Sequence, residues 1–314
     1  MIITLTPNPS IDRTIGVPDL QPGEVNRATT SRIDPGGKGV NVSRALSANG
    51  VQTVAVLPLG GPEGHLMSEL LDAAGVQHVG VTVPGTLRMN IAIVEPDGTT
   101  TKVNEPGPAL GPEHTDALLS AVTANAAVGV WVVGCGSLPP GADPNLLADV
   151  ITRARALGAK VAVDSSGAPM AAAIAAKPDL IKPNHEELEE LVGRALPTLG
   201  EVVTAAQEVV TSGIETVVVS LGGDGAVLVN RDTAIHAVAS ISNPLSTVGA
   251  GDCLLAGLLA AFARNAASRQ ALEDGVRWGA AAVTLPGSQV PGPTDLQGIP
   301  VTVSTDLDFT RRIA

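Results

Sequence analysis

Apolar residues gather in short β-branched runs that alternate with longer stretches of helical spacing. The short runs are typical of strands and span 2–6, 130–134, 160–166, 216–222 and 225–230. The middle three runs lack strict polar alternation, as do strands that are buried on both faces. Ala- and Leu-rich helical patterns lie at 63–74, 113–126, 144–157, 185–193, 200–212, 252–266 and 269–284. This alternation predicts an α/β sandwich around a mostly parallel sheet.

Two segments, 13–31 and 86–106, break this rhythm with short extended pieces joined by Pro and Gly turns. Asp97-Gly98, between two alternating arms, predicts a hairpin. We therefore expect a small β lid inserted into an α/β core made of residues 1–12, 32–85 and 107–314. A lid of this kind can cover a site and exclude water. Its open edges favour pairing with a second subunit, so a homodimer formed through the lid is expected.

Composition narrows the classes of partner. The 314 residues carry a formal net charge of −12, which would repel nucleic acid and an anionic membrane. Aromatic residues make up 1% of the chain and Tyr is absent, which argues against a base-stacking surface. Cys135 and Cys253 are too few for a Cys-rich metal site or a disulfide scaffold, and we expect buried thiols. We see no signal peptide or membrane-spanning run, so a cytoplasmic protein is expected.

The stretch STVGAGDCLLAGLLAAF (246–262) places one carboxylate at the start of an apolar helix pattern. Gly249, Ala250 and Gly251 lead directly into Asp252. One interpretation is that Asp252 caps the helix, since Asp is a preferred N-cap residue. The other is that Asp252 is a catalytic base beside backbone N–H groups that hold an anion.

A second glycine-rich stretch, DPGGKGVNVSRAL (34–46), also enters a helix. Its glycines, Gly37 among them, allow a ligand to approach the backbone closely, and Lys38 adds a positive charge. The stretch therefore predicts a site for a phosphate or for sugar oxygens, with a plain turn and a solvated lysine as the alternative. Asn41 lies one turn into the helix, where it could face the same ligand.

Two further motifs allow both a structural and a functional interpretation. In KPNHEELEEL (182–191), Asn184 and Glu187 have the spacing of a capping box, but they could also order water around Mg²⁺. In SLGGDGA (220–226), Ser220, Gly222 and Gly225 fit either a hairpin or a loop that approaches phosphates.

Three single residues complete the candidates. Asp12 follows the first strand, at the end of the sheet where α/β proteins bind ligands, and could accept hydrogen bonds from sugar hydroxyls. Arg88 opens a lid strand, and its guanidinium could reach a phosphate with two donors. Ser137 ends another strand. Taken singly, each is also typical of a structural or solvated residue.

Taken together, the two glycine-rich stretches resemble the two signatures of the ribokinase-like (PfkB) carbohydrate kinases, and KPNHEE resembles that family's Asn-x-x-Glu motif. The resemblance runs from about residue 3 to residue 291, and TLTPNPSIDRT, VDSSG and IKPN narrow it to the hexose-phosphate branch.

The resemblance implies a three-layer α/β/α sandwich with a β-sheet lid. It also implies an ATP-dependent kinase for a ketohexose phosphate. The expected reaction converts D-fructose 1-phosphate to fructose 1,6-bisphosphate, with tagatose 6-phosphate or fructose 6-phosphate as alternative acceptors. Lys38 favours the first two acceptors, and a non-catalytic sugar-phosphate-binding regulator is a remoter alternative.

The resemblance also implies roles for the candidate residues. Asp252 matches the catalytic base, and Gly249, Ala250 and Gly251 match the anion hole. The sugar-phosphate site is expected at Asp12, Gly37, Lys38, Asn41, Arg88 and Ser137, the ATP loop at Ser220, Gly222 and Gly225, and Mg²⁺ with its waters at Asn184 and Glu187. Ser246 stands where many members have Asp, which puts a monovalent-cation site in doubt.

Overall fold

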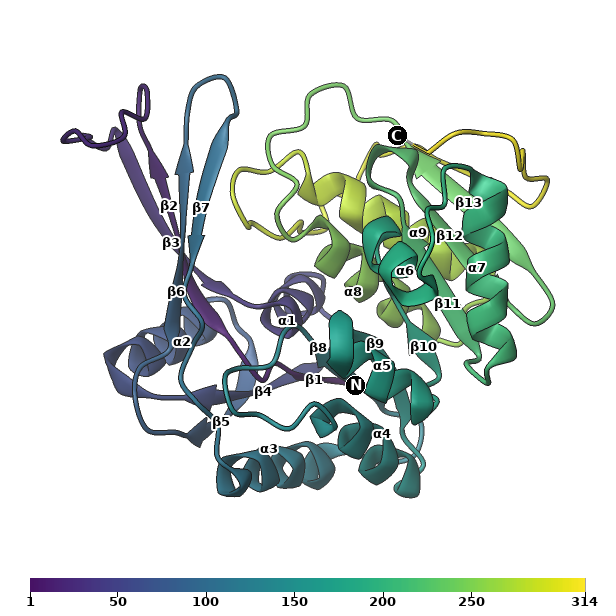
Figure 1. The fold of residues 1–314 in the computed structure, drawn as a ribbon, viewed down its shortest axis with the longest axis horizontal. Coiled ribbons are helices and arrows are strands. Elements are labelled where there is room, and N and C mark those ends of the chain that lie inside the picture. Colours follow the sequence, from purple (N-terminus) through teal and green to yellow (C-terminus); the bar gives the residue numbers. More distant parts are fainter. Residues whose placement is uncertain (314) are drawn as a thin grey trace.

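The computed structural model describes residues 1–313. Within them, the larger sheet has ten strands in the order β14-β13-β12-β11-β10-β9-β8-β1-β4-β5 (Figure 1). The strands are β1 (Ile2–Leu5), β4 (Thr53–Leu59), β5 (Gln77–Thr82), β8 (Trp131–Cys135), β9 (Lys160–Asp164), β10 (Leu180–Ile181), β11 (Thr216–Ser220), β12 (Ala226–Asn230), β13 (Ala234–Ala239) and β14 (Val301–Ser304). From β11 to β5 the neighbours are parallel, and β12, β13 and β14 add an antiparallel edge. The predicted mostly parallel sheet is confirmed.

Helices cover both faces of this sheet. One face packs against α1 (Lys38–Ala48), α2 (Gly61–Ala73), α8 (Ala250–Phe262) and α9 (Ser268–Ala282). The other packs against α3 (Pro112–Asn125), α4 (Leu146–Ala156), α5 (Gly167–Ala175), α6 (His185–Val192) and α7 (Leu199–Thr211). Successive residues of β1 point to opposite cores, with Ile2 on the α8 side and Ile3 on the α4 side. This is the expected three-layer α/β/α sandwich.

The structure shifts several predicted ends. The helix predicted over 252–266 begins at Ala250 and ends at Phe262, and Asn265 beyond it adopts a left-handed backbone with φ 58°. The strand predicted over 160–166 ends at Asp164, because the chain then turns toward α5. Strands β4, β5, β13 and β14 and helix α5 were not predicted.

A four-stranded sheet stands away from the sandwich as a lid (Figure 1). Its order is β3-β2-β6-β7, with bounds β2 (Ser10–Gly16), β3 (Thr30–Gly36), β6 (Arg88–Val94) and β7 (Thr100–Asn104). The predicted hairpin joins β6 to β7, and the Asp97 carboxylate accepts a hydrogen bond from the Thr99 N–H at 2.9 Å.

Strands β2 and β3 extend past the first predicted inserted segment, 13–31, while β6 and β7 lie within the second, 86–106. Ser10 pairs with Gly36, so the ladder of β2 and β3 begins before residue 13 and continues beyond residue 31. Because β3 ends at Gly36 and α1 begins at Lys38, the lid joins the second glycine-rich stretch directly.

The order in which the chain adds strands to the sheet reverses at β1. Strands β4 and β5 lie on one side of β1, and the later strands, from β8 onward, lie on the other. In open α/β sheets, ligands bind beyond the carboxyl ends of the strands at such a point. The candidate residues that follow β1, β8, β10 and β11 therefore share one edge of the sheet, beside the start of α8.

Candidate active site

Asp252 lies in the first turn of α8 and is 8% exposed. Gly249 is the N-cap residue and the helix begins at Ala250, so Asp252 is its third residue. The interpretation of Asp252 as the cap is therefore wrong. Its Oδ2 instead accepts a hydrogen bond from Asn41 Nδ2 in α1 at 2.8 Å.

Arg44 fixes the orientation of Asn41. The Arg44 guanidinium is buried and donates through Nη1 to Asn41 Oδ1 at 3.1 Å and to the carbonyls of Pro35 at 3.0 Å and Ser288 at 3.1 Å. Because Asn41 accepts from Arg44 with its oxygen, its amide nitrogen is left to face Asp252. Arg44 thus orients the Asn41 amide, and Asn41 in turn orients the Asp252 carboxylate.

Burial, and after it the negative charge of Asp164, raise the pKa of Asp252 to about 7. The bond from Asn41 and the charges of Lys38 and Lys182 oppose this rise. A carboxylate whose pKa lies near neutrality can accept a proton in the reaction and release it afterwards. The environment of Asp252 is therefore suited to a general base.

Asp164 holds two lysines beside this carboxylate. It is fully buried at the end of β9, with Oδ1 2.7 Å from Lys38 Nζ and Oδ2 2.9 Å from Lys182 Nζ. Burial alone would raise the pKa of Asp164, but the charges of Lys182 and Lys38 outweigh it and lower the pKa. Asp164 is thus ionised and fixes two ammonium groups in the site.

The first turn of α8 offers backbone donors next to these ammonium groups. The N–H groups of a first helical turn have no partner within the helix and carry the positive end of its dipole. A Cβ added at Gly251 would lie 3.5 Å from Lys182 Nζ, and one at Gly249, where φ is 78°, would lie 3.8 Å from Asn41 Nδ2. The backbone donors at the start of α8, the candidate base and a lysine therefore lie close together.

Asn184 and Glu187 form the predicted capping box at the start of α6. Asn184 Oδ1 accepts from the Glu187 N–H at 2.7 Å, and Glu187 Oε2 accepts from the Asn184 N–H at 2.8 Å. The second carboxylate oxygen, Oε1, lies 3.4 Å from Lys38 Nζ. The box therefore caps the helix and also holds one carboxylate oxygen in the site.

Two carboxylates hold the Lys38 ammonium in the site. The ammonium contacts Asp164 and Glu187, and their charges outweigh burial and raise the pKa of Lys38 above its usual range.

Asp12 and Arg88 lie on the lid at the mouth of the site. Asp12 Oδ1 accepts from Ser10 Oγ at 2.6 Å and from Asn90 Nδ2 at 3.1 Å. Burial raises the pKa of Asp12, while those two bonds and the charges of Arg88 and Arg44 act in the opposite direction. Arg88 Nη1 donates to the Glu105 carbonyl at 3.4 Å, and its buried Nε has no partner among residues 1–313.

Ser137 lies beyond β8, where its hydroxyl is 3.5 Å from Asn8 Nδ2. The Asn8 Oδ1 atom and the Asn90 Oδ1 atom are buried without a hydrogen-bond partner in the part of the chain that the structure describes. Such atoms are rare in folded proteins, and a ligand hydroxyl could supply the missing donor.

Ser220, Gly222 and Gly225 lie where β11 turns into β12, around the short 3₁₀ helix η1 (Gly222–Asp224). The predicted hairpin is confirmed, because β11 and β12 are antiparallel. The Ser220 N–H donates to the Pro183 carbonyl at 3.1 Å, and Ser220 forms a bridge with Asn184. The loop therefore lies next to the capping box.

Sequence reasoning missed Asp164, Lys182, Arg44, Asn8 and Asn90. A usable signal existed for the first two: each is the charged residue at the carboxyl end of an otherwise apolar run, VAVD (161–164) and LIK (180–182). A charge is rarely buried without a partner, so one acid and one lysine at neighbouring strand ends indicate a pair.

The pfkB family carbohydrate kinase model matches residues 6–295. A 1-phosphofructokinase of Rhodobacter capsulatus is 40% identical over 260 residues, 82% of each chain. The ATP-dependent 6-phosphofructokinase isozyme 2 of Escherichia coli is 36% identical over 95% of this chain and 97% of its own. The crystal structure of phosphofructokinase-2 from Escherichia coli in complex with substrates and products matches with a TM-score of 0.91 at 36% identity, over 95% of this chain and 97% of that one. The chain belongs to the pfkB family of carbohydrate kinases.

Proposed function

We propose that the chain transfers the γ-phosphoryl group of ATP to a ketohexose phosphate, with D-fructose 1-phosphate as acceptor and fructose 1,6-bisphosphate as product. The observation that carries the chemistry is the buried Asp252, with its pKa of about 7, in the first turn of α8 beside two lysines. The choice of acceptor is supported by the 1-phosphofructokinases that this chain resembles.

Asp252 is proposed to take the proton of the acceptor hydroxyl. As the hydroxyl oxygen bonds to the γ-phosphorus, the bond between that phosphorus and the bridging oxygen breaks and ADP leaves. The N–H groups of Gly251 and of its neighbours in α8 stabilise the charge on the transferring group. Lys38 and Lys182, fixed by Asp164, add positive charge beside it.

Asp12, Asn41, Arg88 and Ser137 are proposed to bind the acceptor. The buried, unpartnered Nε of Arg88 suits the acceptor's own phosphate, because a guanidinium can offer that group two donors. Asp12 is held by Ser10 and Asn90 so that a second carboxylate oxygen, Oδ2, is left for sugar hydroxyls. Gly37 lets the ligand approach the backbone where the lid meets α1.

Mg²⁺ is proposed at Asn184 and Glu187. Among residues 1–313, no three His, Cys, Asp or Glu side chains form a metal site. The oxygen of Glu187 that faces the site suits an ion that keeps several waters and takes its other ligands from phosphates. When bound, the ion neutralises phosphate charge. Ser220, Gly222 and Gly225 are proposed to bind the ATP phosphates.

A second candidate acceptor is fructose 6-phosphate, since the 6-phosphofructokinase isozyme 2 of Escherichia coli is 36% identical. Tagatose 6-phosphate differs from it only in stereochemistry at one carbon. Lys38 favours fructose 1-phosphate or tagatose 6-phosphate over fructose 6-phosphate, but it does not choose between the first two. The choice therefore requires a direct comparison of substrates.

The test is a coupled ADP-release assay with fructose 1-phosphate, fructose 6-phosphate, tagatose 6-phosphate and free fructose. The proposal predicts the highest kcat/KM with fructose 1-phosphate. It also predicts at least about tenfold less with free fructose, since one lost charge-assisted hydrogen bond is worth about 1.5–3 kcal/mol. Equal kcat/KM values for fructose and the best sugar phosphate would refute the assignment. ATP turnover absent with every acceptor would favour a binding regulator.

We also propose that two copies pair through the lid. Strands β3 and β7 are open edges, and Ile33 and Val103 on them are 39% and 54% exposed. Replacing both with Asp should convert a dimer to a monomer in sedimentation equilibrium. A wild-type monomer at micromolar concentration would contradict this.

None of the helices within residues 1–313 is long and apolar enough to cross a bilayer. A cytoplasmic location remains a prediction.

A further inference from the structure

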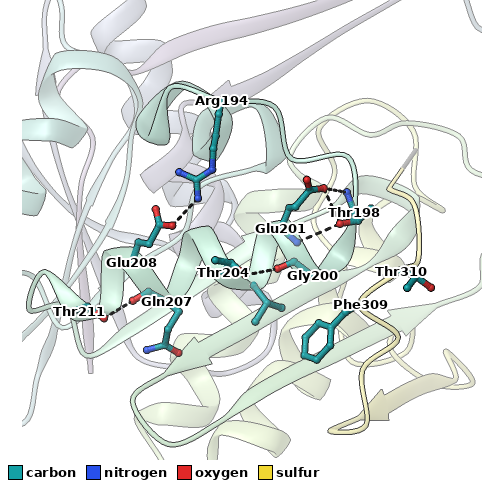
Figure 2. A pocket seen from close by; sticks show the side chains of 11 residues that line it. Arg194, Thr198, Gly200, Glu201, Thr204, Gln207, Glu208, Thr211, Phe309 and Thr310 are labelled. Atoms are coloured by element: carbon teal, nitrogen blue, oxygen red, sulfur yellow. Dashed lines mark hydrogen bonds and ion pairs between the residues drawn. The ribbon is translucent and has the colours of Figure 1, made fainter.

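The segment after β14 returns to the sandwich and lies against the start of α7. The Leu199 N–H donates to the Arg311 carbonyl at 2.9 Å, and the Gly200 N–H donates to the Phe309 carbonyl at 3.1 Å. The Ile313 N–H donates to the Pro197 carbonyl at 3.1 Å. Figure 2 shows Phe309 and Thr310 beside the first turns of α7. The carbonyls of Arg311 and Phe309 satisfy N–H groups that the start of α7 leaves free, so the segment is fixed in place.

From this position Arg311 reaches the loop between β11 and β12. Its Nη2 lies 2.5 Å from Asp224 Oδ1, and the two side chains are 37% and 16% exposed. Asp224 is the last residue of η1, directly before Gly225. Its backbone carbonyl is bonded to His236 Nε2 on β13 at 2.7 Å. Asp224 is therefore held at its carbonyl by the sheet and at its carboxylate by the C-terminal segment.

Three backbone hydrogen bonds within residues 221–225 shape the loop, but few side chains pack against its outer part. Gly222 and Gly225 have φ of 58° and 86°, and glycine has the greatest backbone freedom of any residue. A Cβ added at Gly222 or Gly223 would meet nothing within 4 Å, so packing does not fix the outer part of the loop. Gly225 is confined, because a Cβ there would lie 2.0 Å from the Ala237 carbonyl. Arg311 therefore holds Asp224, the residue that joins Gly222 and Gly223, which nothing packs against, to the confined Gly225.

We propose that Arg311 is a positioning residue for the nucleotide. Through Asp224 it holds η1 in the shape that receives the ATP phosphates, although it lies 87 residues further along the chain. This inference rests on the proposed function of the loop as the ATP site. It gives the C-terminal segment a role in binding ATP and none in binding the acceptor.

The test measures the Kd for ATP by calorimetry, the KM for ATP and for the acceptor, and the thermal midpoint. The variants are Arg311→Gln, Asp224→Asn and both together. Arg312→Gln, which removes the same charge from the adjacent exposed residue, is the matched control. We expect each single variant to raise the Kd and KM for ATP by roughly threefold to tenfold, the range of one coupled pair. The double variant should do no worse, and Arg311→Lys should restore part of the loss.

The acceptor KM should stay unchanged in all variants. A lowered thermal midpoint with an unchanged Kd for ATP would overturn the proposal, because Arg311 would then only fasten the segment. Additive effects in the double variant would overturn it as well. Ser220→Ala separates this failure from that of the ATP site. If it weakens ATP binding while Arg311→Gln does not, only the role of Arg311 falls. If neither variant affects ATP binding, both assignments fall.

Discussion

Asp252→Asn should make the protein more stable at alkaline pH while it removes the proposed base. Burial and the charge of Asp164 raise the pKa of Asp252 from its ordinary value of 3.8 to about 7 in the folded protein. The folded state therefore holds this proton more tightly than the unfolded state does. Wild-type stability from this group is full below about pH 4 and is lost as the pH rises to about 7. The amide cannot ionise and escapes that loss.

The magnitude follows from the gap between the two pKa values. Three pKa units at about 1.4 kcal/mol each give about 4 kcal/mol above pH 7. At pH 5, where the wild-type carboxyl is still protonated in the folded state, the gain should be about 2 kcal/mol. The amide oxygen can keep the hydrogen bond from Asn41, which now joins Asp252 Oδ2 at 2.8 Å. The expected gain thus grows with pH.

The assay is urea denaturation of the wild type and Asp252→Asn at pH 5 and pH 8, reported as the free energy of unfolding. Asp232→Asn, which removes a carboxylate from an exposed residue after β12, is the control and should show no pH-dependent gain of this size. A variant that is less stable than the wild type at pH 8 would refute the reasoning. An equal gain in the free energy of unfolding at both pH values would show that the effect comes from packing and not from the ionisation of Asp252.

Arg88→Ala should raise the KM for the sugar phosphate at least about tenfold, the value of one lost charge-assisted bond, and leave the KM for ATP within about twofold in steady-state kinetics. An equal rise for ATP would remove Arg88 from the acceptor site. Glu187→Gln should raise the Mg²⁺ concentration needed for half-maximal activity, because the oxygen that faces Lys38 loses its charge, while the capping bonds to Asn184 persist. A lowered thermal midpoint with an unchanged Mg²⁺ titration would leave Glu187 as a helix cap alone.

Sequence periodicity predicted the sandwich, because buried strands and amphipathic helices differ in their repeat. It missed β4, since Pro58 lies within that run and proline is unusual in a central strand. In the structure Pro58 lies beyond the end of β1, so only β5 flanks β4 there. Helix α5 was missed because Gly167 and Pro169 are typical of turns. Strand β14 was missed because it is only four residues long and is defined by its pairing with β13, which the sequence pattern does not show.

The candidate site was predicted where its chemistry is local in the sequence. The glycines before Asp252 and the spacing of Asn184 and Glu187 are readable from neighbouring residues. The Lys38–Asp164–Lys182 cluster joins Lys38 to two residues that lie more than a hundred positions further along the chain, and only the fold brings them together. The N-cap interpretation of Asp252 failed because Gly249, with its left-handed backbone, is the N-cap and the helix begins at Ala250, two residues before Asp252.

The most direct test of the central claim is the turnover of Asp252→Asn. With ATP and fructose 1-phosphate, kcat should fall by about 10²- to 10⁴-fold, the usual contribution of a general base. The Kd values for both ligands, measured by calorimetry on the same folded variant, should stay within about threefold of the wild-type values. Retained kcat would contradict the account, because Asp252 would then not take the hydroxyl proton.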